Sequence, residues 1–169
     1  PQRTVNGDAP VHGEDFDPAW IPTTLRYHDH AMDVTGFNVA KGLAGFYLLV
    51  DDRERELAAA GIIPEPGGPY DVGLVVADQR FNADGTIAYD FLDHNGRIGD
   101  VELVNGLVQP YFEVERRKYR FRILHGANAR VYELRLSSRQ KMAIIGTESW
   151  DLPRAVEVES FEVSSGMRH

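Results

Sequence analysis

The sequence predicts an all-β protein that folds as an antiparallel sandwich or barrel. Short apolar runs recur along most of the chain, and turn signals separate them about every 8–12 residues, as in sandwiches. Two of these signals, Asp84-Gly85 and Asn105-Gly106, are dipeptides of tight hairpins. The chain has 169 residues, of which 43% are apolar and 26% charged. This is enough for one domain and part of a second.

The first third of the chain is predicted to hold two strands and one helix. Thr23–His30 and Phe46–Val50 are strand-like, and the second is an unbroken apolar run, as expected of a strand buried on both faces. Residues 31–41 connect them and leave room for a helical turn. Residues 51–61 begin with acidic side chains and end at Gly61, which are signals of a short surface helix. We expect its charges to be solvated.

Residues 64–69, Pro-Glu-Pro-Gly-Gly-Pro, form the clearest linker. It is short and stiffened by proline, so it should fix the two sides rather than free them. We therefore expect three parts: residues 1–50 as the C-terminal part of a first domain, 51–69 as helix and linker, and 70–169 as an incomplete second domain. Strands of the second domain are predicted at residues 70–79, 86–89, 101–104, 107–108, 111–115, 118–124, 131–136, 142–145 and 155–163.

A basic cluster lies at residues 116–122, where apolar and basic side chains alternate. A strand here would carry Phe121 on one face and Arg120 and Arg122 on the other. The chain has a net charge of −8, and acidic residues are mixed with the cluster. The cluster is therefore predicted to be a sheet face with cross-strand pairs, and no nucleic-acid partner is expected. No apolar run is long enough to predict a membrane span, and a homo-oligomer stays compatible with the sequence.

Two histidines, His28 and His30, stand two residues apart in the first predicted strand. In a regular strand their side chains would share one face and Asp29 would point to the other. Two imidazoles held this way can bind one metal ion or a close pair of ions, and neutral imidazole suits copper, zinc, iron and nickel alike. By spacing alone, such a pair is more often two ordinary polar residues than a metal site.

The residues around this pair carry a resemblance to a known family. The stretch reads Tyr27-His28-Asp29-His30-Ala31-Met32 and continues into Gly42-Leu43-Ala44-Gly45-Phe46. It closely resembles the second copper-binding motif of bacterial multicopper oxidases, in the branch of spore-coat laccases, bilirubin oxidases and phenoxazinone synthases. Further motifs follow in the family's order at residues 103–106, 110–111, 113–115, 118–124 and 152–154. The resemblance covers most of residues 23–167.

The resemblance implies an all-β, cupredoxin-like Greek-key β-sandwich, with the end of domain 1 and most of domain 2. It implies that His28 and His30 each ligate one copper of the dinuclear type 3 pair in a trinuclear centre that reduces O₂ to water. The implied partners are O₂, a small phenolic or aminophenolic substrate, and the remaining cupredoxin domains of the same protein. Each imidazole should give its other ring N–H to a nearby acceptor. Asp33 is a candidate for proton supply.

Parts of the family pattern are missing. The chain has no cysteine, so it holds no type 1 copper site, which needs a thiolate. Pro10 stands where the first copper motif has a histidine, so His12 is expected to be an ordinary loop residue; His94 and His169 are expected to be solvated and His125 structural. We therefore expect part of a longer oxidase, inactive alone. The alternative is a copper-free structural or interaction module, and a zinc site ranks last.

Overall fold

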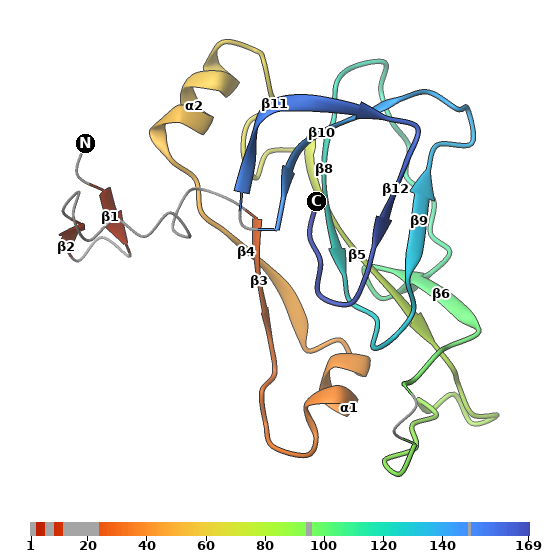
Figure 1. Cartoon of the computed structure of the whole chain (residues 1–169). Coiled ribbons are helices and arrows are strands. Elements are labelled where there is room, and N and C mark those ends of the chain that lie inside the picture. Colours follow the sequence, from red (N-terminus) through yellow and green to blue (C-terminus); the bar gives the residue numbers. More distant parts are fainter. Residues whose placement is uncertain (1–2, 6–8, 12–23, 94–95, 149) are drawn as a thin grey trace.

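A computed structural model describes residues 3–5, 9–11, 24–93, 96–148 and 150–169. These residues form twelve strands and two short helices (Figure 1), so the predicted predominance of strands is confirmed. The strands are β1 Arg3–Val5, β2 Ala9–Val11, β3 Thr24–His28, β4 Ala44–Leu48, β5 Asp71–Gln79, β6 Val101–Val104, β7 Leu107–Val108, β8 Arg120–His125, β9 Tyr132–Arg135, β10 Met142–Thr147, β11 Trp150–Val158 and β12 Ser160–Val163. The helices are α1 Thr35–Ala40 and α2 Asp52–Ala59.

The largest sheet has four strands in the order β7-β6-β5-β8. The other strands pair two by two and antiparallel: β1 with β2, β3 with β4, β9 with β12, and β10 with β11. Within the large sheet β5 and β8 run parallel, from Asp71 opposite Arg120 to Val76 opposite His125. The expectation of a purely antiparallel arrangement is wrong at this pair. The long connection between β5 and β8 lets the chain return to the same end of the sheet, which parallel pairing requires.

Both predicted tight turns are confirmed. Asn105 and Gly106 have φ values of 51° and 78°, the left-handed pair that joins two-residue hairpins such as β6–β7. The Asn105 side chain also ties the turn to β5, because it accepts from the Val75 N–H at 2.8 Å and donates to the Gly73 carbonyl at 3.0 Å. In the other turn the Gly85 N–H donates to the carbonyl of Asn82 at 2.9 Å.

Three predicted strands differ from the structure. Residues 111–115 form no strand, and Tyr111 is 88% exposed there. Residues 86–89 contribute only one isolated bridge, between Phe81 and Ile87. The single strand predicted at residues 155–163 is two strands, because β11 pairs with β10 while β12 pairs with β9. The alternation of apolar and polar residues in the sequence does not show that the neighbouring strand changes from β10 to β9 at Glu159.

The interior contains charged as well as apolar side chains. Leu124 and Val163 are fully buried, and the other buried apolar residues are Ala40, Leu103, Ile123 and Ala127. On β8 the basic side chain is the buried one, because Arg122 is 2% exposed while Phe121 is 42% exposed. Arg122 can be buried because it pairs with the carboxylates of Glu54 and Asp71, and a buried charge requires such partners.

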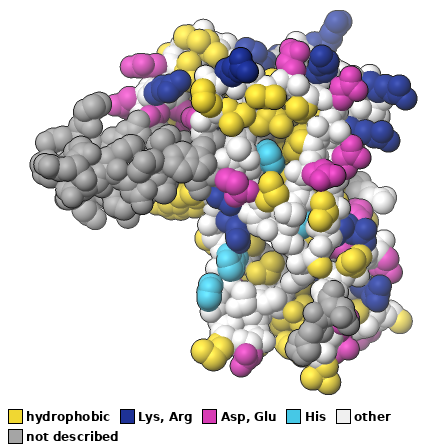
Figure 2. Space-filling model, viewed as in Figure 1, with side chains coloured by type: hydrophobic (Ala, Val, Ile, Leu, Met, Phe, Trp, Pro, Cys, Tyr) yellow, Lys and Arg dark blue, Asp and Glu magenta, His cyan; other side chains and the backbone are white. Residues whose placement is uncertain are grey.

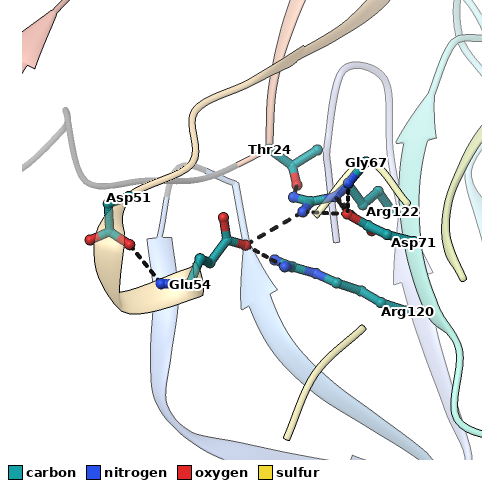
Figure 3. A network of polar contacts seen from close by, with 7 residues as sticks. All are labelled: Thr24, Asp51, Glu54, Gly67, Asp71, Arg120 and Arg122. Atoms are coloured by element: carbon teal, nitrogen blue, oxygen red, sulfur yellow. Dashed lines mark hydrogen bonds and ion pairs between the residues drawn. The ribbon is translucent and has the colours of Figure 1, made fainter. Parts of the chain in front are cut away.

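Helix α2 begins as predicted, since the Asp51 side chain caps it by accepting from the Glu54 N–H at 2.8 Å. The prediction that its charges are all solvated is wrong. Glu54 is 2% exposed and lies against Arg120 and Arg122 of β8 (Figure 3). With eight residues α2 is the longest helix of the described ranges, and none there is both long and apolar enough to cross a membrane.

Candidate metal site

His28 and His30 lie at the end of the β3–β4 hairpin. His28 is the last residue of β3 and pairs with Ala44, whereas His30 lies two residues beyond the strand and is exposed. The two rings are nevertheless neighbours, with centroids 5.8 Å apart and planes tilted by 31°. Figure 2 shows histidine side chains (cyan) side by side at the surface where β3 and β4 run in Figure 1. The predicted proximity is present even though the strand ends before His30.

The hydrogen bonding of His28 selects which ring nitrogen is free. Its Nδ1 lies 2.6 Å from the carbonyl oxygen of Asp29. A carbonyl oxygen only accepts, so Nδ1 carries the proton and the Nε2 lone pair is available for a ligand. Metal-binding histidines commonly use their second nitrogen in this way, because the bond to the carbonyl fixes the ring and its tautomer. The expected N–H acceptor is therefore found for His28.

Asp29 fixes the turn that carries His30. Its Oδ2 accepts from the Asn38 side-chain amide at 2.9 Å and from the Ala31 N–H at 3.1 Å. These two bonds lower the pKa of the Asp29 carboxyl below its ordinary value, and the bond from Asn38 has the larger effect. Asp29 thus bonds to neighbouring backbone, and its bond to Asn38 also ties the end of β3 to α1.

Asp33 lies in the turn between β3 and α1. It is exposed and has a φ of 64°, a left-handed conformation that aspartate adopts more readily than most side chains. Its suggested part in proton supply stays a prediction.

The described residues supply an incomplete ligand set. Across the described ranges, no three histidine or carboxylate side chains gather closely enough to hold a metal ion, and the sequence has no cysteine. The two imidazoles could therefore hold copper only together with ligands from other parts of a protein.

The two other histidines that the structure describes, His125 and His169, are not candidates for this site. His125 is 2% exposed, its Nε2 lies 2.5 Å from the carbonyl oxygen of Arg130, and burial lowers its pKa, so it fits the expected structural role. The expectation that His169 is solvated is wrong. Both of its ring nitrogens are buried because its backbone pairs with Ile123 of β8. His12 and His94 lie outside the described residues.

A hollow of about 240 Å³ lies beside His28. Arg26, Thr35 and Asn128 are among the residues that line it, and they come from three separate segments of the chain. No local signal in the sequence predicts that Asn128 lies here. It is brought in because its side-chain amide donates to the Gly36 carbonyl of α1 at 3.0 Å.

The chain is similar to named oxidases in sequence and in structure. It is 44% identical over 135 residues to a laccase of Haloferax volcanii, an alignment that covers 76% of this chain and 22% of the laccase. The crystal structure of the multicopper oxidase McoA from Aquifex aeolicus matches with a TM-score of 0.78 and 38% identity over 87% of this chain and 32% of McoA. No protein-family model matches the chain.

A differently named relative has similar coverage. The cell division protein FtsP of Salmonella typhimurium is 34% identical over 145 residues, which are 86% of this chain and 30% of FtsP. The chain thus spans about a third of the length of these relatives, or less. The neighbours with solved structures confirm the predicted cupredoxin-like fold. From its motifs, its strand-rich fold and these similarities, we conclude that the chain is homologous to one part of the laccases and multicopper oxidases.

Proposed function

We propose that the chain is part of a laccase-like oxidase that oxidises phenols or aminophenols and reduces O₂ to water. In this proposal His28 and His30 each give one nitrogen to the type 3 copper pair of a trinuclear centre. The observation that supports it best is the hydrogen bond from His28 Nδ1 to the Asp29 carbonyl, which leaves Nε2 free beside the His30 ring. Bound copper would supply the one-electron redox chemistry that side chains lack.

The chain's own residues would hold the two imidazoles in position. The β3–β4 ladder fixes the backbone of His28, and it extends by one more bond from the Asp29 N–H to the Leu43 carbonyl at 3.0 Å. The Asp29 carboxylate restrains the next turn, so the exposed His30 ring stays near its neighbour. Asp33, which is exposed three residues further on, is proposed to deliver protons. The type 1 copper and the remaining ligands would come from other domains of the same protein.

The test is to replace each histidine with alanine in the longer protein that carries this chain. Copper content and O₂ consumption with a phenol are then measured. We expect both to fall sharply in His28→Ala and in His30→Ala. Met32→Leu, an exposed change two residues from His30, serves as the control and should leave both unchanged. Full copper content in both histidine variants would contradict the proposal.

A second candidate is a copper-free structural or interaction module. It is supported by the 34% identity to a protein named for cell division and by the presence of only two close imidazoles among the described residues. Metal analysis of the purified longer protein separates the candidates. Copper bound in fixed ratio favours the oxidase, absence of metal favours the module, and stoichiometric zinc without colour would indicate a zinc site instead.

A further inference from the structure

We infer that a buried network of ion pairs positions β3, and with it His28, and that Thr24 is the positioning residue through which it acts. The network consists of Glu54, Asp71, Arg120 and Arg122, and Figure 3 shows Thr24 at its edge. This inference rests on the proposed role of His28 as a copper ligand.

The network joins elements that are far apart in sequence. Glu54 comes from α2, Asp71 begins β5, and the two arginines lie on β8. Glu54 Oε1 accepts from Arg120 Nη1 and, at 3.4 Å, from Arg122 Nη2. All four side chains are at most 8% exposed. Two acidic and two basic groups balance, so the interior carries no net charge from this network.

Arg122 connects the network to β3. Its Nε and Nη2 donate to the Asp71 carboxylate at 2.8–3.0 Å, and its Nη1 donates to Thr24 Oγ1 at 2.7 Å. A guanidinium is planar and presents its N–H groups in fixed directions. Because Asp71 fixes the orientation of this group, the donor that reaches Thr24 is fixed as well.

Thr24 is the first residue of β3 and is 9% exposed. Its main chain is also held, because Arg168 Nε donates to the Thr24 carbonyl at 3.3 Å. Among the described residues β3 pairs with β4 alone. No further strand pairing fixes it on the rest of the fold, so hydrogen bonds such as those from Arg122 and Arg168 to Thr24 contribute to its placement. An extended strand transmits this placement over the four residues to His28, a span of about 13 Å.

A second anchor acts near the other end of the hairpin. The Gln79 side-chain amide donates to the Ala40 carbonyl of α1, and the Phe37 ring packs against Tyr89 with centroids 5.1 Å apart. If this anchor alone held the histidines, the Thr24 hydroxyl would be dispensable for metal binding. The two possibilities give opposite results for a substitution that removes this hydroxyl only.

The experiment uses the longer, copper-loaded protein and compares Thr24→Val with Thr24→Ser. Valine keeps the shape of threonine but removes Oγ1, and the pairs among Glu54, Asp71 and the arginines stay possible. Serine keeps the hydroxyl. Copper affinity is measured by competition with a chelator, the Cu(II) EPR spectrum is recorded, and the thermal unfolding midpoint is followed in parallel.

We expect Thr24→Val to lower copper affinity by about 3–10-fold and to change the EPR spectrum. This loss is smaller than the roughly 10–100-fold found when a direct partner of a metal ligand is removed. Thr24→Ser should restore both readouts. Thr86→Val removes a hydroxyl that bonds within the exposed turn at residues 82–86 and should leave both unchanged. Thr24→Ala removes the same hydroxyl and replaces the valine variant if that one does not fold.

Two results would overturn the inference: wild-type affinity in Thr24→Val, or equal losses in the valine and serine variants. His28→Ala in the same assay separates this failure from failure of the proposed function. If His28→Ala lowers affinity and Thr24→Val does not, only the positioning role is wrong. If His28→Ala also has no effect, the copper role and the positioning role fall together.

Discussion

The two ends of β3 are held in opposite ways. At its start Thr24 is buried and receives hydrogen bonds from Arg122 and Arg168, which lie about 100 residues or more further along the chain. At its other end His28 is half-buried, His30 is exposed, and the bonds that fix them come from Asp29 and its near neighbours. The start of the hairpin thus bonds to arginines far along the chain, whereas the side chains proposed to bind metal lie beside hydrogen-bonding groups that are close in sequence.

This separation has a physical reason. A charge buried with its partners is costly to disturb, so it holds an element in place. A metal ligand needs an accessible lone pair, and an exposed turn with local hydrogen bonds offers one at little cost to the fold. Substitutions at the buried end should therefore change stability strongly, and substitutions at the exposed end should change it little.

The largest effect is expected for Glu54→Ala. It leaves Arg120 and Arg122 buried with one carboxylate fewer, and breaking a buried pair in this way costs about 3–5 kcal/mol of unfolding free energy. Denaturant unfolding measures the loss. Glu56→Ala, an exposed change on the same helix, is the control and should stay within about 0.5 kcal/mol of wild type. Similar losses in both variants would refute the buried role of Glu54.

A smaller contrast is expected between two glycines. A Cβ at Gly73 of β5 would lie 2.8 Å from the Phe46 ring of β4, and Gly73→Ala should cost about 1–3 kcal/mol through overpacking. A Cβ at Gly45 would meet the Tyr27 hydroxyl at 2.7 Å, but Tyr27 is 60% exposed and its ring can move aside. Gly45→Ala should therefore cost less than about 1 kcal/mol. Equal thermal unfolding midpoints for the two variants would contradict this ranking.

His30→Ala should have little effect on stability. The side chain is exposed beyond the end of β3, so unfolding free energy should stay within about 0.5 kcal/mol of wild type while copper binding is lost. Denaturant unfolding and metal analysis on the same preparation check both statements. A large loss of stability would mean that the ring has a structural role.

The smallest effect is expected in the pH dependence of the exposed turn. The lowered pKa of Asp29 means that the folded state prefers its ionised form. The resulting stabilisation is present above the carboxyl's unfolded pKa and is lost as pH falls through the lower, folded pKa. Asn38→Ala removes the largest cause of the shift and should raise the Asp29 pKa toward its ordinary value. A carboxyl NMR titration measures it, and an unchanged pKa would show that Asn38 is not the cause.

Local chemistry made several features predictable from sequence. The Asn105-Gly106 turn, the Asp51 cap of α2 and the closeness of His28 and His30 each depend on residues a few positions apart. The family resemblance extended this to the cupredoxin-like class, because its motifs recur in order along the chain. The sequence alone therefore identified His28 and His30 as the two imidazoles of the candidate site.

Other features depended on partners far away in the sequence. In the sequence, Glu54 and the arginines of β8 cannot be distinguished from surface charges, because Arg120 lies 66 positions after Glu54 and meets it only when α2 packs against β8. The parallel pairing of β5 with β8 and the burial of the His169 ring nitrogens likewise depend on segments that are distant in sequence. Hydrophobic alternation records which residues share a face but not whether that face is covered. That is decided only when distant segments supply, or fail to supply, the opposite charge and the covering side chains.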